Sequence, residues 1–182
     1  MSNENRRKEI LDAAAKSFRE KGYKETSMRG IAALVDMKAG SLYYHFISKE
    51  DLLVAVHEEG MRKITKEVKD AIGDKQDPWD RMEAAVIAHL NCLLDPGDYA
   101  QVVIRAIPRE DSPMRRRLAA LRDNYEGILK ELIIALPLSA NKDKHYFNLL
   151  LLGALNWTHS WFKPEKGNSA EIGRKFIEIL KS

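Results

Sequence analysis

The sequence has few of the features that mark secreted, disulfide-stabilised or membrane proteins. Cys92 is the one cysteine among 182 residues, which excludes an intrachain disulfide and fits a reducing compartment. The longest apolar run, "YFNLLLLGALNW", has 12 residues and contains two asparagines, whereas a membrane span needs roughly 20. No apolar segment follows the basic N-terminus, so no secretory signal is predicted. We therefore expect a cytoplasmic protein.

Motifs for catalysis and metal binding are also absent. There is no nucleophile elbow, no Gly-rich phosphate loop and no HExxH, and the five histidines show no paired ligand spacing. We expect neither an enzyme nor a bound metal or cofactor. Cys92 near His89 is a thin basis for metal sensing. The apolar surroundings of Cys92 favour an inert buried thiol over a redox switch.

Positive charge is concentrated near the N-terminus. The net charge is +3, and residues 1–47 hold nine Lys and Arg against six Asp and Glu. In residues 48–182 the remaining 21 Lys and Arg are balanced by 21 Asp and Glu. A basic N-terminal part on a neutral body favours a polyanion as the partner of that part. A surplus of three charges also arises by chance.

Apolar residues recur at helical spacing, and no segment reads as a strand. With 45% apolar residues the chain can bury a sizeable core. Gly22 and Gly73 are expected to end helices, and Thr26 or Ser27, Ser48 and Ser169 to cap the starts of others. The pattern predicts an all-α fold of about nine helices, near 6–21, 28–35, 39–46, 48–72, 78–94, 97–107, 112–136, 142–161 and from 169 onward.

The second and third helices have the lengths and the short turn of a helix-turn-helix. Asp36 can adopt the left-handed backbone that a tight turn requires. The third helix would lie in the major groove, with its small first residues near base edges. Leu42, Phe46 and one of the two tyrosines are expected in the core. The predicted DNA contacts, to bases or phosphates, are Thr26, Ser27, Arg29, Lys38, Ala39, Gly40, Ser41, Tyr43, Tyr44, His45 and Lys49.

Residues 26–53, "TSMRGIAALVDMKAGSLYYHFISKEDLL", resemble the DNA-binding signature of the TetR family of transcriptional regulators. The shared elements are the Thr-Ser cap, the "IA" pair, "GSLYYHF" and "SKEDLL". Asp36 stands where the family usually has glycine, and we expect this to alter only the turn. The resemblance implies a homodimeric repressor of palindromic double-stranded DNA. It implies a helix-turn-helix domain at 1–47 and a ligand-binding and dimerisation domain at 48–182.

The helix predicted at 142–161 is apolar nearly all round, and such a helix must be buried on more than one side. Burial against its own domain and against a second copy would satisfy this requirement. The apolar stripe of the last helix makes that helix the natural neighbour in a four-helix dimer interface. A central helix of a monomeric core is the alternative. The predicted interface residues are Leu149, Gly153, Trp157, Ile172, Phe176 and Ile179.

Asn156-Trp157 and "WFKP" at 161–164 resemble the TetR branch that senses acyl-coenzyme A thioesters. An apolar tunnel among the helices from 78 to 161 would accept an acyl chain, and arginines around "AIPREDSPMRRR" would face the phosphates. The same arginines are equally typical of a solvated helix start. The predicted ligand contacts are Arg105, Arg109, Tyr125, Asn156, Trp157, Trp161 and Lys163.

We therefore predict a ligand-responsive DNA-binding regulator. It would be a repressor released from its operator by a small hydrophobic inducer such as an acyl-coenzyme A. Two alternatives stay open. One is a TetR-like regulator of a multidrug efflux gene that responds to diverse hydrophobic compounds. The other is a helical protein-interaction module without DNA binding, which would need neither "GSLYYHF" nor the localised charge.

Overall fold

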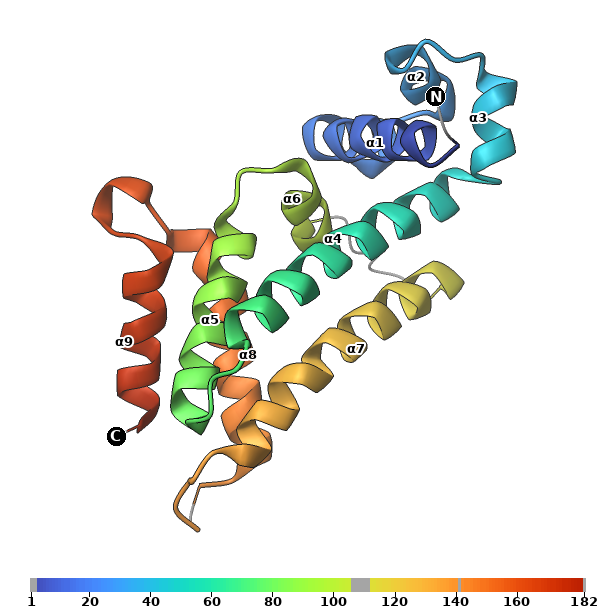
Figure 1. Cartoon of the computed structure of the whole chain (residues 1–182). Coiled ribbons are helices and arrows are strands. Elements are labelled where there is room, and N and C mark those ends of the chain that lie inside the picture. The colour runs from blue at the N-terminus through green and yellow to red at the C-terminus, as the bar shows by residue number, and fades with distance from the viewer. Residues whose placement is uncertain (1–2, 106–111, 141, 182) are drawn as a thin grey trace. The chain divides into compact units, whose positions relative to one another are not determined.

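The computed structural model describes residues 3–105, 112–140 and 142–181, which form nine α-helices, one short 3-10 helix and no strand (Figure 1). The prediction of an all-α fold with about nine helices is confirmed. Within these residues, no helix has the length and hydropathy to cross a membrane. The helices are α1 Asn3–Glu25, α2 Met28–Leu34, α3 Ala39–His45, α4 Lys49–Ile72, α5 Pro78–Leu94, α6 Asp98–Arg105, α7 Pro113–Ala135, α8 Lys144–Trp161 and α9 Ser169–Lys181, with the 3-10 helix at Pro164–Lys166.

Most of the predicted helix ends are where the local chemistry places them. Gly22 has a φ of 79° and interrupts the helical backbone near the end of α1. The Ser27 Oγ accepts a hydrogen bond from the Gly30 amide at 3.1 Å, and the Ser48 Oγ accepts one from the Asp51 amide at 3.0 Å. The prediction that Ser169 caps the last helix is wrong by one residue. Ser169 is the first residue of α9, because the longer side chain of Asn168 reaches the Glu171 amide at 3.0 Å.

The helices group into two compact units. Unit 1 comprises Met1–Met61 and Pro96–Arg122, and unit 2 comprises Arg62–Asp95 and Asp123–Ser182. Both α4 and α7 begin in unit 1 and end in unit 2. The predicted boundary between a DNA-binding domain and a ligand-binding domain after residue 47 stays a prediction. The two units reflect which helices lie close together and not which function each part has.

Unit 1 has a core built from the inward faces of α1, α2, α3 and the first part of α4. Leu42 of α3 and Phe46 after it are buried in this core, as the spacing predicts. Val102 of α6 is buried in the same core, and α6 packs against α1. Residues 10–56 and α6 therefore share one core, which places α6 against the helix-turn-helix scaffold.

Unit 2 is organised around α5, which packs against both α8 and α9 (Figure 1). Gly173 lets α9 approach closely, since a Cβ at that position would lie 2.7 Å from the Cγ1 of Ile87. Among the most deeply buried residues of this core are Met82, Val86, Leu90, Leu151, Leu155 and Ile177 of α5, α8 and α9, and Leu129 and Ile133 of α7. The buried polar side chains of this interior include His89, Asn148 and Thr158, of which His89 is considered below.

Candidate DNA-binding surface, apolar face and interior polar pair

The turn between α2 and α3 holds the two helices in a fixed relation. Asp36 takes the left-handed backbone predicted for it, with a φ of 50°. The amides of Val35 and Met37 both donate to the Ala32 carbonyl, at 3.2 and 2.9 Å. A left-handed residue at the end of a helix satisfies the last carbonyls in this way. The turn therefore fixes α3 on α2 without using the side chains of α3.

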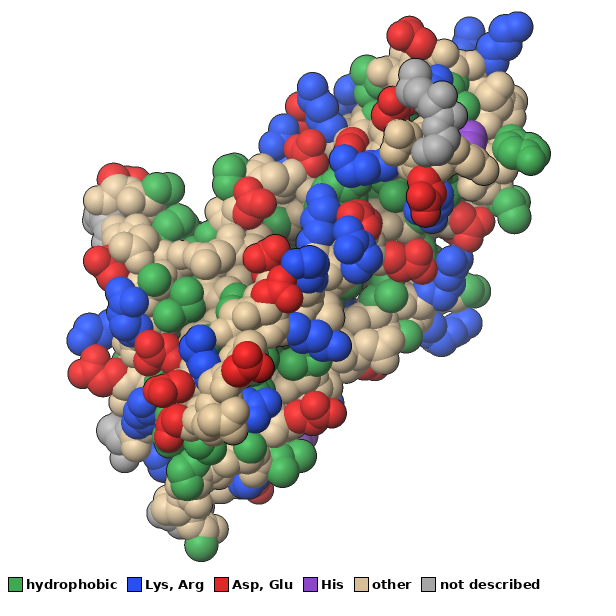
Figure 2. All heavy atoms as spheres, in the orientation of Figure 1, with side chains coloured by type: hydrophobic (Ala, Val, Ile, Leu, Met, Phe, Trp, Pro, Cys, Tyr) green, Lys and Arg blue, Asp and Glu red, His purple; other side chains and the backbone are tan. Residues whose placement is uncertain are grey.

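The outer face of α3 is exposed and partly aromatic. The exposed fraction is 51% for Tyr43 and 88% for Tyr44, so the expectation that one tyrosine packs inward is wrong. Leu42 and Phe46 already fill the inward positions of so short a helix. Ser41 is exposed too, and the rings of Tyr44 and His45 meet edge to face at 5.8 Å. Figure 2 shows hydrophobic side chains projecting beside a histidine at the α3 end of unit 1.

Not all of the basic residues of residues 1–47 are available to a polyanion. Arg6 donates to the Val35 carbonyl at 2.8 Å and pairs with Glu9. The guanidinium of Arg7 lies 5.1 Å from the ring centre of Phe46. Arg29 and Lys38 are exposed. Arg29 lies on α2 and Lys38 directly precedes α3, and both are cations of the predicted contact set.

Thr26 and Lys49 are turned toward the protein itself. The Thr26 side chain is buried and donates to the carbonyls of Ser17 and Gly22. The Lys49 Nζ donates to three carbonyls, those of Tyr23 and Thr26 at 2.9 Å and that of Lys24 at 3.3 Å. Lys49 thus ties the start of α4 to the end of α1. Contacts of these two residues with DNA stay predictions, and the structure gives each of them a bonding role inside unit 1.

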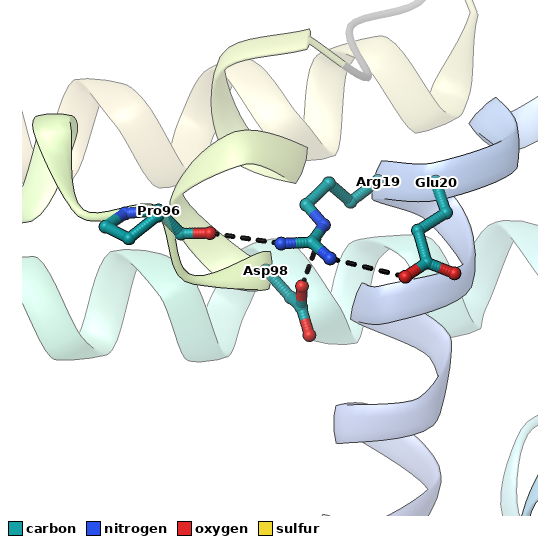
Figure 3. Close-up of polar contacts among 4 residues, drawn as sticks. All are labelled: Arg19, Glu20, Pro96 and Asp98. Atoms are coloured by element: carbon teal, nitrogen blue, oxygen red, sulfur yellow. Dashed lines mark hydrogen bonds and ion pairs between the residues drawn. The ribbon is translucent and has the colours of Figure 1, made fainter.

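A polar clasp joins α1 to α6 (Figure 3). The Arg19 Nε lies 2.9 Å from an Asp98 carboxylate oxygen, and Arg19 also donates to the Pro96 carbonyl at 3.2 Å. On the same pair of helices the Tyr99 hydroxyl donates to Asp12 at 2.7 Å. Burial and the Asp12 carboxylate both raise the pKa of Tyr99, so its hydroxyl keeps its proton. These bonds span 77 and 87 residues, and no local pattern in the sequence could have indicated them.

The helix α8 has one buried and one exposed apolar face. Its inner face buries Phe147, Leu151, Leu152 and Leu155 in unit 2. Ile179 of α9 is also exposed, at 68%, while Ile172 and Phe176 are half-buried. The exposed outer positions of α8 follow helical spacing and are Tyr146, Leu149, Leu150, Gly153, Trp157 and Trp161, which we call the α8 stripe.

The predicted ligand contacts that the structure describes divide between the interior and the surface of unit 2. Tyr125 is 5% exposed, inside unit 2, whereas Trp157 and Trp161 belong to the α8 stripe. Asn156 and Lys163 are exposed as well. Arg109 and the side chain of Arg105 lie outside the described residues. Their roles as ligand contacts stay predictions, and Tyr125 is the member of the set that reaches the interior.

Tyr125 of α7 forms a buried pair with His89 of α5. The sequence indicated for His89 only a weak possibility of metal sensing together with Cys92. The Tyr125 hydroxyl lies 2.7 Å from the His89 Nδ1, and the rings stack at 5.7 Å. Burial lowers the pKa of His89 to about 4 and raises the pKa of Tyr125 above its ordinary value, so both groups are neutral at pH 7. Cys92 is half-buried and its pKa is raised to about 11, chiefly by burial. The described residues contain no group of three side chains that could hold a metal ion.

An N-terminal and a C-terminal stretch of the chain each match a known protein family. Residues 10–56 match "Bacterial regulatory proteins, tetR family", and residues 75–182 match "Tetracyclin repressor-like, C-terminal domain". The chain is similar to the fatty acid metabolism regulator protein of Bacillus subtilis (strain 168). The two are 22% identical over 180 residues, which cover 96% of this chain and 93% of that protein.

Solved structures share the whole fold. AibR in complex with isovaleryl coenzyme A and operator DNA is 24% identical, with a TM-score of 0.82 over 96% of this chain and 97% of that chain. FadR of Bacillus subtilis in complex with stearoyl-CoA is 20% identical, with a TM-score of 0.84 over the same shares of the two chains. Likeness at this level of identity shows a common fold.

Proposed function

The chain belongs to the TetR family of bacterial regulatory proteins and is therefore a DNA-binding regulator rather than an enzyme; from that premise we propose that it represses its target genes until an acyl-coenzyme A releases it from the operator. We place the protein in the cytoplasm, where operator DNA and coenzyme A thioesters are both accessible. Binding to one type of DNA site and release by one class of ligand are the two parts of this proposal.

The observation that carries the DNA-binding part is the turn-fixed α3 with its exposed outer face. Ser41 and the small residues before it would approach base edges, and the Tyr43 hydroxyl would donate to a phosphate; the exposure of Ser41 and Tyr43 supports these roles. Arg29 and Lys38 supply exposed positive charge beside them. Loss of one phosphate contact lowers the salt dependence of binding by about one unit, whereas loss of a base contact changes sequence preference. Lys38→Met and Ser41→Ala therefore test different halves of this interface.

A homodimer follows from the α8 stripe. Exposed apolar surface of this kind, running along most of an 18-residue helix, marks an interaction site. The stripe contains Gly153, whose lack of a side chain allows a second helix to approach, and Ile179 of α9 adds apolar surface. Two copies of one surface related by a twofold axis cover each other. The dimer then presents two α3 helices to a palindromic site. The two helices lie about 34–36 Å apart if the half-sites are separated by one turn of DNA.

The ligand class rests on the relatives and on the composition of unit 2. AibR is bound to isovaleryl coenzyme A and FadR of Bacillus subtilis to stearoyl-CoA. The core of unit 2 is built from leucine, isoleucine, valine and methionine side chains, and apolar surroundings of this kind suit an acyl chain. A free acid would lack the phosphates of coenzyme A and would carry its charge at the end of the chain.

Release would act through the elements that belong to both units. The 24 residues of α4 carry the chain from Lys49, at the helix-turn-helix, into unit 2 over roughly 36 Å. A tilt of a few degrees over that length shifts one end of α4 by a few ångströms. Such a shift is enough to move one α3 helix out of register with its half-site on the DNA. The Arg19–Asp98 clasp makes α6 part of the same body as α1. Coupling is reciprocal, so operator DNA must weaken ligand binding by the factor by which ligand weakens DNA binding.

The test is a titration of the operator complex with acyl-coenzyme A, free fatty acid and coenzyme A, each alone, followed by fluorescence anisotropy of labelled DNA. The operator is first identified by selecting bound duplexes from random sequence. We expect release by the long-chain thioester, little release by the acid and none by coenzyme A. If no thioester of any chain length releases the DNA, the proposed ligand class is wrong. Selective binding to a palindromic site would still support the DNA-binding part of the proposal.

A further inference from the structure

The His89–Tyr125 pair leaves one polar atom unused in an apolar interior. His89 is 3% exposed and Tyr125 is 5% exposed. One hydrogen bond joins the Tyr125 hydroxyl and the His89 Nδ1. The His89 Nε2 is buried and has no hydrogen-bond partner among the described residues. Leaving a buried polar group unpaired is costly, so native proteins rarely do it without a use for the group.

The nature of that atom follows from which partner donates in the hydrogen bond between His89 and Tyr125. In one tautomer the Tyr125 hydroxyl donates to Nδ1, and Nε2 carries the ring proton as the one unpaired donor. In the other tautomer Nδ1 donates to the hydroxyl oxygen, which leaves both the hydroxyl proton and the Nε2 lone pair without partners. Both arrangements leave the same number of protons and lone pairs unpaired, but they differ in the strength of the bond that is made. A phenol is a good donor and a poor acceptor, and a neutral imidazole nitrogen is a good acceptor, so the bond from the Tyr125 hydroxyl to Nδ1 is the stronger one. Tyr125 therefore holds His89 in the form whose Nε2–H is a free donor.

A second buried histidine shows that this outcome is specific to His89. His57 of α4 lies in unit 1, is 4% exposed and also has an Nε2 without a partner among the described residues. Its Nδ1 bonds to the Leu53 carbonyl at 3.0 Å, and a carbonyl can only accept. Nδ1 of His57 must then carry the proton, and its Nε2 is an acceptor. The two histidines are equally buried but offer opposite groups.

We propose that the His89 Nε2–H, fixed by Tyr125, is a hydrogen-bond donor for the carbonyl oxygen of a hydrophobic ligand that binds in unit 2. The inference rests on the proposed function for the coenzyme A thioester as the ligand in question. A neutral carbonyl suits the site better than a carboxylate. The ring is neutral, because burial lowers the pKa of His89 to about 4, and an anion beside it would lose its hydration without gaining a countercharge. The pair thus selects acyl compounds over ionised acids.

The experiment compares two ligands that differ in this oxygen alone. Hexadecanoyl-coenzyme A carries the thioester carbonyl, and S-hexadecyl-coenzyme A is the thioether with the same chain and no carbonyl oxygen. Their dissociation constants are measured by calorimetry on the full-length protein. We expect the wild type to prefer the thioester by about tenfold, the upper range for one neutral hydrogen bond. Using the ratio within each variant cancels changes in packing that affect both ligands alike.

The variants assign the preference to one atom. In His89→Leu the two ligands should bind equally, and His89→Gln, whose amide can donate from nearly the same place, should restore most of the preference. His57→Leu is the matched control, with the same substitution at an equally buried histidine, and it should keep the tenfold ratio. The ketone 2-tridecanone, which has a carbonyl and no coenzyme A, should bind His89→Leu about tenfold more weakly than wild type.

The outcomes separate the inference from the proposed function. Equal binding of thioester and thioether to the wild type would overturn the inference and leave acyl-coenzyme A as the inducer; a site filled by water alone gives this result. A thioester preference that survives in His89→Leu would overturn it as well. If neither coenzyme A compound binds but the ketone shows the loss in His89→Leu, the proposed ligand class is wrong and the carbonyl site stands. Failure of all three compounds to bind overturns both.

Discussion

Replacing Lys49 by methionine should destabilise unit 1 without changing the salt dependence of DNA binding. The Lys49 Nζ donates to the carbonyls of Tyr23, Lys24 and Thr26 and lies 4.5 Å from the ring centre of Tyr23. Hydrogen bonds to a charged group contribute roughly 1.5–3 kcal/mol each when buried. Two of these three are part-buried and one is exposed, so water competes for all of them. We therefore expect a total loss of about 2 kcal/mol, which lowers Tm by about 4–8 °C in a chain of this size.

The assay pairs two measurements on two variants. Lys38→Met is the matched control, since Lys38 is exposed just before α3. Calorimetric melting should show the Tm loss for Lys49→Met and none for Lys38→Met. Binding to operator DNA at several salt concentrations should show a slope reduced by about one unit for Lys38→Met and an unchanged slope for Lys49→Met. A reduced slope with an unchanged Tm for Lys49→Met would refute this reasoning and make Lys49 a phosphate contact.

Three further predictions concern the interface, the clasp and the interior. Trp157→Glu places a charge in the middle of the α8 stripe and should convert the dimer to a monomer, measured by light scattering at micromolar protein; a persisting dimer would place the interface elsewhere. Arg19→Met should shrink the ratio of operator affinities without and with ligand about fivefold, or about 1 kcal/mol, because it cuts the α1–α6 clasp, whereas Lys16→Met on the same helix should not. Burial lowers the pKa of His57 and of His89 to about 4 in the folded protein, whereas the pKa in the unfolded chain is about 6.5. Between these two pH values the unfolded chain therefore binds more protons than the folded protein. The free energy of unfolding should thus fall by about 1.4 kcal/mol per pH unit for each histidine as pH drops through that window, and a urea titration of His89→Leu should show about half the slope.

Local patterns carried most of the fold. Helical periodicity placed nine helices, and Ser27, Ser48 and Gly22 act where their capping chemistry predicts. The helix-turn-helix was predictable because its turn, Asp36 included, depends on neighbours within a few residues. The misplaced cap at Ser169 shows the limit of such rules, since Asn168 and Ser169 are both good caps and the choice depends on side-chain reach.

Site residues were predictable in so far as they lie on one short helix. Ser41, Tyr43 and Tyr44 share the exposed face of α3 because the inward positions of that helix are already taken. Periodicity alone did not show that both tyrosines point outward. The predicted ligand contacts fared differently, as Tyr125 lies inside unit 2 while Trp157 and Trp161 lie on its surface.

The helices, the turn chemistry and the family could be predicted from the sequence, because each is encoded by residues within one or two helical turns of each other or by a contiguous motif. Which polar groups meet depends on the folded arrangement of the helices. Lys49 reaches carbonyls 23 to 26 residues away, His89 meets Tyr125 across 36 residues and Arg19 meets the Pro96 carbonyl across 77. Partners at such separations are chosen by how helices pack, and helix packing is governed by apolar shape, which carries no information about the polar atoms that it brings together.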